Sequence, residues 1–282
     1  MSTSPAPSSS GIDLYSFPTP NGLKATIAFE ELKSLGVELN YTLKTVDITK
    51  ERPAPPGERD PAAVFADRRL TVRPIFVVQI VDHDRRGLKI WESGAIYLYL
   101  ARHYDIGYAL HFEDEDEEDE MHSWLFLANA GLAGKGGTIW ELSFLPTKQP
   151  AAARATIAEL KRLYGVYESR LAEDGGRDYL VGVGKGKLSY ADLAAYPWFR
   201  AAPVNTGLTS FSAAGFPHVA AWMERIEARE GVKKGIPKGE YINQLKSPEG
   251  WEETLKKSLD SCHNRHRGSR KITAPGESRY SS

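Results

Sequence analysis

Residues 12–36 read IDLYSFPTPNGLKATIAFEELKSLG, and this stretch decides the fold of the N-terminal part of the chain. Its opening residues are rich in β-branched and aromatic side chains, which favours a short strand. Two prolines then end that strand, and the Asn-Gly pair at residues 21–22 supplies a turn. Apolar residues at helical spacing follow as far as Gly36, and the alternation in residues 39–48 predicts a second strand. The stretch therefore predicts a β-α-β unit.

The next part of the chain continues this order with two strands and a helix. Residues 72–81, VRPIFVVQIV, predict a strand, and residues 88–91 predict a short strand that returns beside it after a polar turn. Apolar residues at helical spacing then predict a helix over residues 95–104. A β-α-β unit followed by β-β-α is the order of a thioredoxin-like domain, which we place at residues 12–105.

Helical patterns fill most of the remaining sequence. They cover residues 121–134, 152–173, 190–199 and 219–230. These patterns predict an all-α domain over residues 119–235. The acidic run EDEDEEDE at residues 113–120 leads into it, and we expect a solvated linker over residues 106–118. We expect a disordered leader over residues 1–11 and a partly disordered C-terminal extension over residues 236–282.

Composition excludes several classes of function. The chain of 282 residues carries 36 Lys and Arg against 37 Asp and Glu, so it lacks the basic excess of a nucleic-acid-binding protein. Its single cysteine, Cys262, cannot form an internal disulfide, a redox pair or a cysteine-based zinc site. Histidines and carboxylates show no metal-ligand spacing, so no metal is expected. Without a targeting segment or a long apolar stretch, we expect a cytoplasmic protein that does not enter a membrane.

Glu92 and Ser93 lie where a predicted strand ends and a helix begins. A helix N-terminus attracts anions through its free N–H groups and its dipole. Glu92 can accept from an ammonium group and Ser93 can donate to a carboxylate, so the pair suits the two charges of an α-amino-acid group. The alternative is that Ser93 only caps the helix and Glu92 only complements the helix dipole.

Asn21 lies near the N-terminus of the first predicted helix. Such a position lowers the pKa of a thiol, and the Asn21 side chain could donate an N–H to a thiolate. The alternative is that Asn21 and Gly22 form only a turn. Further along, Ser189 and Asp192 have the spacing of a capping box, which predicts the start of a buried helix.

Three strings carry a family resemblance: DLYSFPTPNGLKATIAFEEL at residues 13–32, IWESGAIYLYLARHY at residues 90–104 and KLSYADLAAYPW at residues 187–198. Further matching stretches occur in the same order at residues 122–132, 162–171, 179–182 and 216–232. Over residues 12–235 the chain resembles the glutathione transferases, and its first string resembles their fungal nitrogen-regulator-like (Ure2-like) class. The resemblance implies the glutathione transferase fold, with an α/β thioredoxin-like N-terminal domain and an all-α C-terminal domain.

The resemblance also implies a co-substrate and residues that hold it. Glutathione would bind with its γ-glutamyl group on Glu92 and Ser93. Its sulfur would face Asn21, with help from Ser16 or Thr19. The resemblance further implies a homodimer. A small electrophile would dock between the domains, over the helices that carry Trp124, Phe126 and Trp140.

The sequence departs from the family at the approach to a cis-proline, where residues 67–74 read DRRLTVRP in place of an Asn-Pro-x-x-Arg-Val-Pro-like string. The resemblance implies that Pro74 is that proline and that the backbone of Arg73 pairs with the cysteinyl part of glutathione. Arg52 would meet the glycyl carboxylate. Either glutathione binds in a shifted pose, or Arg73 reaches the second pocket and pairs with an acidic substrate.

Three functions remain open at this point. The first is a glutathione transferase that activates the thiol for attack on a small electrophile, in a biosynthetic pathway of secondary metabolism. The second is a glutathione-dependent isomerase that converts a conjugated alkene between cis and trans forms by reversible thiol addition. The third is a non-catalytic regulatory or binding protein on the transferase scaffold. In the first two, Cys262 takes no part, because the reactive thiol comes from glutathione.

Overall fold

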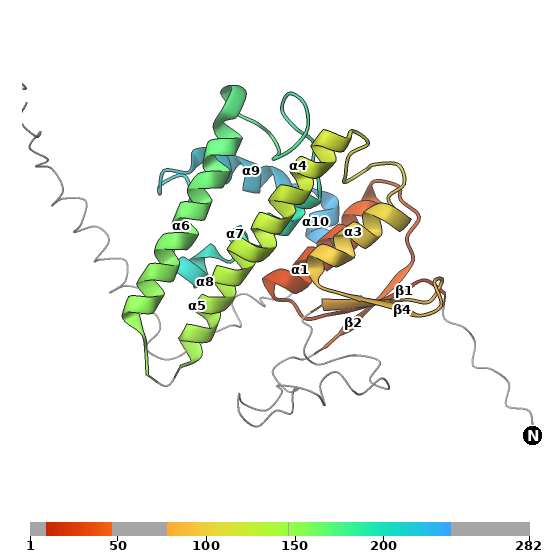
Figure 1. The fold of residues 1–282 in the computed structure, drawn as a ribbon, viewed down its shortest axis with the longest axis horizontal. Coiled ribbons are helices and arrows are strands. Elements are labelled where there is room, and N and C mark those ends of the chain that lie inside the picture. Colours follow the sequence, from red (N-terminus) through yellow and green to blue (C-terminus); the bar gives the residue numbers. More distant parts are fainter. Residues whose placement is uncertain (1–9, 47–77, 146, 238–282) are drawn as a thin grey trace, which may run out of the picture.

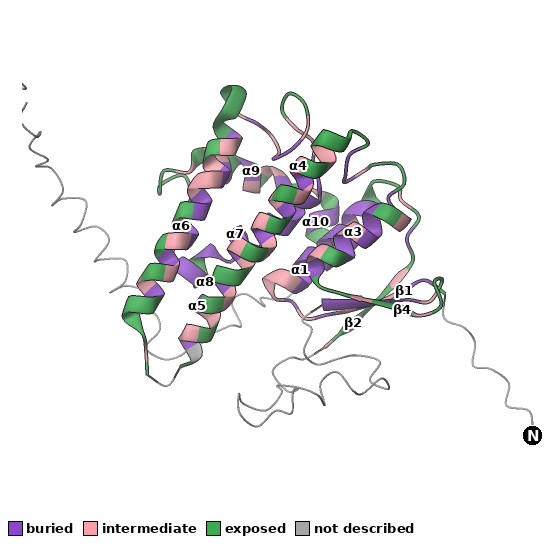
Figure 2. Cartoon of the chain, in the orientation of Figure 1, coloured by how far each residue is buried: buried purple, intermediate pink, exposed green. Residues whose placement is uncertain are grey.

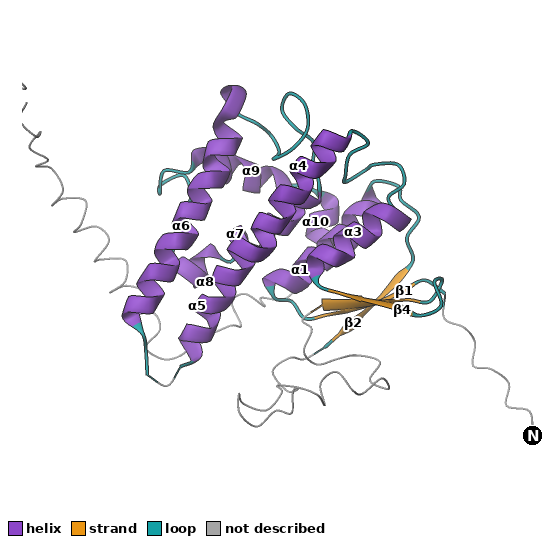
Figure 3. Ribbon diagram, viewed as in Figure 1, coloured by secondary structure: helices purple, strands orange, loops and turns teal. Residues whose placement is uncertain are grey.

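A four-stranded mixed sheet forms the base of the N-terminal domain in the computed structural model, which describes residues 10–46, 78–145 and 147–237. The strands, which Figure 3 draws in orange, are β1 (Ile12–Ser16), β2 (Tyr41–Thr45), β3 (Val78–Asp82) and β4 (Leu88–Trp91). They lie in the order β2-β1-β3-β4. β1 runs parallel to β2 and antiparallel to β3, and β3 runs antiparallel to β4. The predicted strands are confirmed where the structure describes them.

Helices α1 (Pro20–Ser34) and α3 (Ser93–His103) lie between this sheet and the remaining helices (Figure 1). α1 begins where Thr19 accepts a hydrogen bond from the Gly22 N–H at 3.3 Å, and Pro20 suits the first turn because its missing N–H needs no partner there. α1 is buried on nearly all sides from residue 22 to residue 29, because it packs against the sheet and against the helical domain. It is therefore the central element of the domain interface.

The second domain is entirely helical. Its elements are α4 (Glu115–Phe126), the π-helical segment η1 (Leu127–Ala133), α5 (Gly134–Phe144), α6 (Pro150–Ala172), the short 3₁₀ turn η2 (Glu173–Gly175), α7 (Tyr190–Arg200), α8 (Ala202–Thr206), α9 (Pro217–Glu227) and α10 (Glu230–Gly235). α7 is buried along almost its whole length, and the longer helices around it turn their buried faces inward (Figure 2). Tyr164, Tyr167, Phe199 and Trp222 form the aromatic centre of this core. The thioredoxin-like and all-α architecture is confirmed.

The acidic run is partly helical, so the helical domain begins earlier than the expected linker allows. α4 starts at Glu115, and Asp114 caps it by accepting from the Glu117 N–H at 3.0 Å. Carboxylates in the first turn complement the positive end of the helix dipole. Glu118 also turns back to accept from the Phe112 N–H at 2.9 Å. The run therefore starts a helix as well as facing solvent.

Two helices depart from their predicted lengths. The helix expected over residues 121–134 continues through η1 and α5 as far as residue 144. The helix expected over residues 219–230 ends at residue 227 as α9, and an additional helix, α10, begins at residue 230 and packs on α1. A Cβ at Gly231 would lie 2.6 Å from the Glu31 Cα, and one at Gly235 would lie 2.5 Å from the Ile27 Cα. Only glycine allows the two helices to approach so closely.

A buried carboxylate also joins α10 to α1. Glu31 accepts from Arg229 Nε at 2.9 Å and from the Val232 N–H at 3.0 Å. Its side chain is almost completely buried. Because a buried charge is costly unless it is paired and hydrogen-bonded, this arrangement fixes where the end of the helical domain meets α1.

The predicted capping box holds the start of α7. Asp192 accepts from the Ser189 N–H and from the Ser189 hydroxyl, both at 3.0 Å. Its other oxygen accepts from the Leu180 N–H at 3.0 Å and from Trp222 Nε1 at 2.9 Å. One buried carboxylate thus ties the loop before α7 to α7 and to α9.

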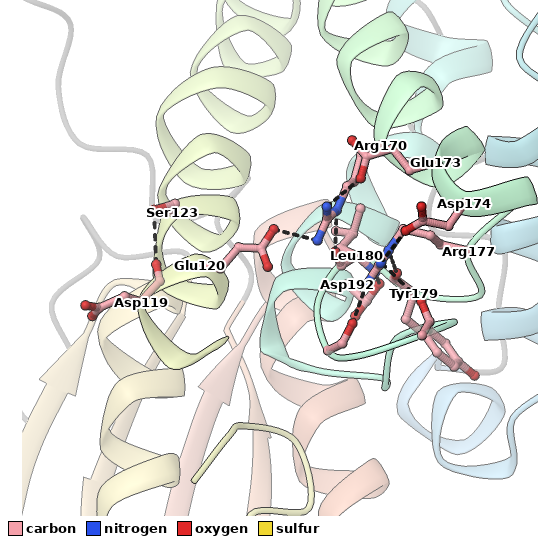
Figure 4. A network of polar contacts seen from close by, with 12 residues as sticks. Asp119, Glu120, Ser123, Arg170, Glu173, Asp174, Arg177, Tyr179, Leu180 and Asp192 are labelled. Atoms are coloured by element: carbon pink, nitrogen blue, oxygen red, sulfur yellow. Dashed lines mark hydrogen bonds and ion pairs between the residues drawn. The ribbon is translucent and has the colours of Figure 1, made fainter. Parts of the chain in front are cut away.

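Two arginines also hold the loop before α7, Arg170 from α6 and the buried Arg177 from within the loop (Figure 4). Arg170 of α6 donates to the Leu180 carbonyl at 2.8 Å and forms an ion pair with Glu120 of α4 at 2.5 Å. Arg177 donates to the Gly182 carbonyl at 2.6 Å and to the Gly184 carbonyl at 3.1 Å. The glycine-rich segment that follows residue 180 is therefore a structural loop before the capped helix.

Within the described residues, no helix has the length and apolar character that crossing a bilayer requires.

Candidate functional site

Glu92 and Ser93 lie at the junction of β4 and α3, as the sequence predicts. Glu92 is exposed and has φ 72° and ψ 121°, a conformation that costs energy in any residue except glycine. Ser93 is buried and begins α3, but its hydroxyl does not cap the helix. Instead, Ser93 Oγ donates to Asn129 Oδ1 at 3.2 Å. The capping alternative for Ser93 is therefore wrong, since this hydroxyl faces the helical domain.

Asn129 comes from the π-helical segment η1, and a lysine meets the same oxygen. Lys24 Nζ donates to Asn129 Oδ1 at 2.6 Å. Gly94 lets this amide approach α3, because a Cβ there would lie 2.6 Å from Asn129 Nδ2. π-helical turns occur often at functional sites, and here the turn carries the residue that reaches Ser93.

Lys24 lies inside the domain interface with its side chain completely buried. Burial lowers the pKa of Lys24 to about 7, and the negative charge of Glu92 opposes that shift. A lysine in this condition can change its charge near neutral pH. It therefore makes the electrostatics beside Glu92 and Ser93 depend on pH.

Asn21 lies in the first turn of α1 and is half-buried. Its Oδ1 accepts from Trp198 Nε1 of α7 at 3.2 Å. Thr19 caps α1, and the buried Ser16 donates to the Phe17 carbonyl at 3.4 Å. Asn21 is therefore tied to the helical domain, whereas Thr19 and Ser16 have local backbone partners.

The three aromatic residues predicted for the second pocket do not form one cluster. Trp124 and Phe126 both belong to α4, but residues two apart on a helix point to different sides. Trp124 lies against Tyr167 of α6, with ring centroids 5.1 Å apart, whereas Phe126 is 61% exposed. Trp140 lies on α5 and is half-buried. Trp124 and Phe126 consequently face different surroundings.

Several predicted site residues lie outside the described residues. They are Arg52, Arg73 and Pro74. Cys262, which is expected to take no part in the chemistry, also lies outside the described residues. The altered approach to Pro74 therefore stays a prediction.

Three residues of the site were missed at the level of sequence: Lys24, Asn129 and Trp198. Lys24 is a lone cation in an otherwise apolar helical run, and Asn129 is a lone amide in another such run. Isolated polar residues on a buried face need partners, so this pattern was a usable signal. Trp198 lies in one of the strings that carry the family resemblance, but nothing in that string points to Asn21.

The arrangement suits a ligand that carries both an amino-acid group and a thiol. The α3 N-terminus offers a carboxylate and a hydroxyl, and the α1 N-terminus offers an amide beside the positive end of a helix dipole. Glutathione combines these groups, and Glu92, Ser93 and Asn21 could hold it. Within the described residues, no cluster of three or more His, Cys, Asp or Glu side chains could hold a metal ion.

The known proteins that this chain resembles point to one family. The sequence model of the family described as "Glutathione S-transferase, C-terminal domain" matches residues 133–230. Glutathione S-transferase-like protein tpcF of Aspergillus fumigatus is 35% identical over 59% of this chain and 76% of its own length. Disulfide-bond oxidoreductase YfcG of Escherichia coli is 32% identical over 81% of this chain and 96% of its own length.

A solved structure matches the fold over most of the chain. It is that of Ure2p in complex with glutathione, with a TM-score of 0.65, 29% identity and coverage of 80% of this chain and 98% of that one. The sequence resemblance, the order of the strands and the all-α second domain therefore all point to the same family. The chain belongs to the glutathione S-transferase family, in its Ure2-like group.

Proposed function

We propose that the protein binds glutathione and activates its thiol for attack on a small electrophile. The observation that supports this most directly is the position of Asn21 at the N-terminus of α1, together with Glu92 and Ser93 at the N-terminus of α3. Each helix N-terminus carries a partial positive charge, and the glutathione groups that would lie there, the thiolate and the γ-glutamyl carboxylate, are negative. The family supports the same ligand, since the Ure2p structure is described as a complex with glutathione.

The γ-glutamyl end would meet Glu92 and Ser93. The Glu92 carboxylate accepts from the ammonium group, and the free N–H groups of α3 meet the carboxylate. Ser93 Oγ has one proton, which it now donates to Asn129 Oδ1 at 3.2 Å. It would turn this proton to the ligand, while Lys24 keeps the Asn129 oxygen paired. We further propose that the Arg73 backbone beside Pro74 holds the cysteinyl part and that Arg52 holds the glycyl end.

The sulfur would lie at the N-terminus of α1, near Asn21. The helix dipole and the Asn21 amide N–H both stabilise a thiolate, which lowers the pKa of the bound thiol. The thiol proton leaves to solvent, and a sulfur electron pair forms the bond to the electrophilic carbon. In a substitution a leaving group departs from that carbon with its electron pair, and in an addition the π electrons move to the neighbouring atom, which takes a proton from water. The Asn21 amide thus stabilises charge and does not itself take the proton. Trp124, Phe126 and Trp140 stay proposed contacts for the electrophile, on separate surfaces of α4 and α5.

Two titrations test this function. Calorimetry with glutathione measures binding, and ultraviolet absorbance of the thiolate measures the pKa of the bound thiol. We expect binding and a thiol pKa below that of free glutathione, with the shift lost in Asn21→Ala. Failure to bind glutathione at millimolar concentration would exclude every glutathione-dependent function.

Product analysis separates the possible reactions of such a thiolate. Conjugation consumes glutathione and the electrophile in equal amounts. Reversible addition to a conjugated alkene leaves glutathione unchanged and yields an isomer. The oxidoreductase name of the Escherichia coli relative favours testing a third reaction, in which the thiolate attacks a disulfide, forms a mixed disulfide and releases one thiol. A second glutathione then attacks the mixed disulfide, which releases the other thiol and leaves oxidised glutathione. Binding with no lowering of the thiol pKa would favour the non-catalytic regulatory alternative.

A homodimer and a cytoplasmic location remain part of this proposal.

A further inference from the structure

A tryptophan of the helical domain contacts the residue proposed to stabilise the thiolate. Trp198 Nε1 on α7 donates to Asn21 Oδ1 on α1 at 3.2 Å, across 177 positions of sequence. Trp198 is only 8% exposed. The bond therefore joins a well-packed ring of one domain to the first turn of the other.

The chemistry of the two groups fixes the orientation of the Asn21 amide. An indole N–H can only donate, whereas a side-chain amide has an accepting oxygen on one branch and two N–H donors on the other. Trp198 therefore holds the Asn21 oxygen, which leaves Nδ2 on the opposite branch. Within the described part of the chain, Asn21 Nδ2 has no hydrogen-bond partner. The donors are thus available to a ligand.

Only this orientation would help a thiolate. A thiolate accepts hydrogen bonds and cannot donate them, so it gains from Nδ2 and is repelled by Oδ1. Without Trp198, the amide of Asn21 could rotate and present its oxygen to the sulfur. The single N–H donor of the Trp198 ring prevents this rotation, because it holds the Asn21 oxygen.

The position of the Trp198 ring is set by a glycine on a third helix. A Cβ at Gly136 of α5 would lie 2.1 Å from Cζ3 of the ring, which no real contact permits. The next residue, Gly137, is different, because a Cβ there would meet nothing within 4 Å. Gly136 therefore makes the space that the ring occupies, and Gly137 is a control in the same helix.

We infer that Trp198 is a positioning residue, which holds Asn21 with its amide donors toward the sulfur of bound glutathione. Trp198 acts through Asn21 and does not touch the reacting atoms. The inference rests on the proposed function, since it needs glutathione in the site. It adds that the helical domain sets the orientation of a thiol-stabilising group in the thioredoxin-like domain.

A double-mutant cycle tests the inference with the full chain and glutathione as the probe. Trp198→Phe removes the donor but keeps an aromatic ring, and we expect the pKa of the bound thiol to rise by roughly one unit. Asn21→Ala should raise that pKa as well. In the double variant, Trp198→Phe should add no further shift, because its effect passes through Asn21. Equal shifts with and without Asn21 would overturn the inference.

The glycine pair gives a second test that keeps both polar groups. Gly136→Ala displaces the Trp198 ring and should raise the pKa of the bound thiol in the direction of Trp198→Phe. Gly137→Ala should leave that pKa unchanged. If the two alanine variants behave alike, the ring position does not control the thiol, and the inference fails. If Gly136→Ala does not fold, Trp198→Phe carries the test.

Two controls separate the possible failures. Trp222→Phe removes another buried indole donor, the one bound to Asp192, so it should lower stability without moving the thiol pKa. A shift in this variant equal to that of Trp198→Phe would mean that loss of stability alone explains the result. If the unaltered protein does not lower the thiol pKa, the proposed function fails. If the unaltered protein lowers the thiol pKa and Trp198→Phe lowers it equally, only the positioning role of Trp198 fails.

Discussion

Lys24 Nζ lies 2.6 Å from Asn129 Oδ1, so the first helix of the thioredoxin-like domain is bound to the π-helical segment of the helical domain. The same Asn129 oxygen accepts from Ser93 at 3.2 Å. A buried ammonium group and a hydroxyl therefore share one amide oxygen as acceptor beside Glu92. The geometry links the charge of a buried lysine to the hydroxyl that is proposed to meet glutathione.

Replacing Lys24 by Met should flatten the pH dependence of stability above neutral pH. The folded pKa of Lys24 is about 7, against 10.5 for an ordinary lysine. The unfolded chain thus binds more protons between these values, and folding stability rises with pH across this window by up to about 1.4 kcal/mol per pH unit. Lys24→Met removes this rise and should be the more stable form at pH 7 and below. Urea unfolding at several pH values measures the effect.

The exposed Lys135 on α5 provides the control for that experiment. Lys135→Met removes a lysine without removing a buried charge, so it should keep the rise between pH 7 and 10.5. The Lys24 interpretation is wrong if Lys24→Met keeps the rise as well. Glu92 is the charge that opposes the lowered pKa of Lys24, so Glu92→Gln should extend the rise to lower pH.

Glu92 should show a trade between local strain and ligand binding. Its φ of 72° is unfavourable for glutamate and acceptable for glycine. Glu92→Gly should therefore keep or raise Tm, by relief of about 1 kcal/mol of strain, while binding of glutathione weakens by roughly tenfold or more. Glu92→Gln removes the charge without removing the strain, so at a pH well above 7, where Lys24 of the folded chain is neutral, it should weaken binding at unchanged Tm. Calorimetry and thermal unfolding of both variants test this, and unchanged affinity would show that Glu92 does not meet the ammonium group.

Much of the fold could be predicted from local sequence, and the reasons are physical. The strand and helix of residues 12–36 follow from side-chain periodicity and from two prolines, which act within a few residues. The capping box of Ser189 and Asp192 is similarly local, and the structure contains it. The positions of Glu92 and Asn21 at helix N-termini could be predicted for the same reason.

The contacts that join the domains could not be predicted in this way. Lys24 and Asn129 are 105 positions apart, and Asn21 and Trp198 are 177 positions apart. Such pairs depend on how two domains pack, which no local pattern encodes. The π-helical turn that directs Asn129 also has the composition of an ordinary α-helix, so the sequence does not reveal it. The capping interpretation of Ser93 failed because its true partner lies in the other domain.

The contact between α1 and α10 should respond sharply to one methyl group. A Cβ at Gly235 would lie 2.5 Å from the Ile27 Cα and 2.8 Å from the Thr26 carbonyl oxygen. Gly235→Ala should force α10 away from α1 and cost about 2 kcal/mol or more. Gly165→Ala in α6 is the matched control, because its Cβ meets nothing within 4 Å. It should raise stability by about 1 kcal/mol through helix propensity. Chemical unfolding decides between these outcomes, and equal effects would show that the α1–α10 contact is loosely packed.

Asp192 should be one of the most sensitive positions for stability. It is completely buried and accepts from four donors: the Leu180 N–H, the Ser189 N–H, the Ser189 hydroxyl and Trp222 Nε1. Asp192→Ala leaves these buried donors without a partner, which should cost on the order of 4 kcal/mol. Asp192→Asn keeps one accepting oxygen and should lose about half as much. Urea unfolding gives both values, and fluorescence of Trp222 reports the local change. A small loss in Asp192→Ala would mean that water replaces the carboxylate, and the loop before α7 would then be held chiefly by Arg170 and Arg177.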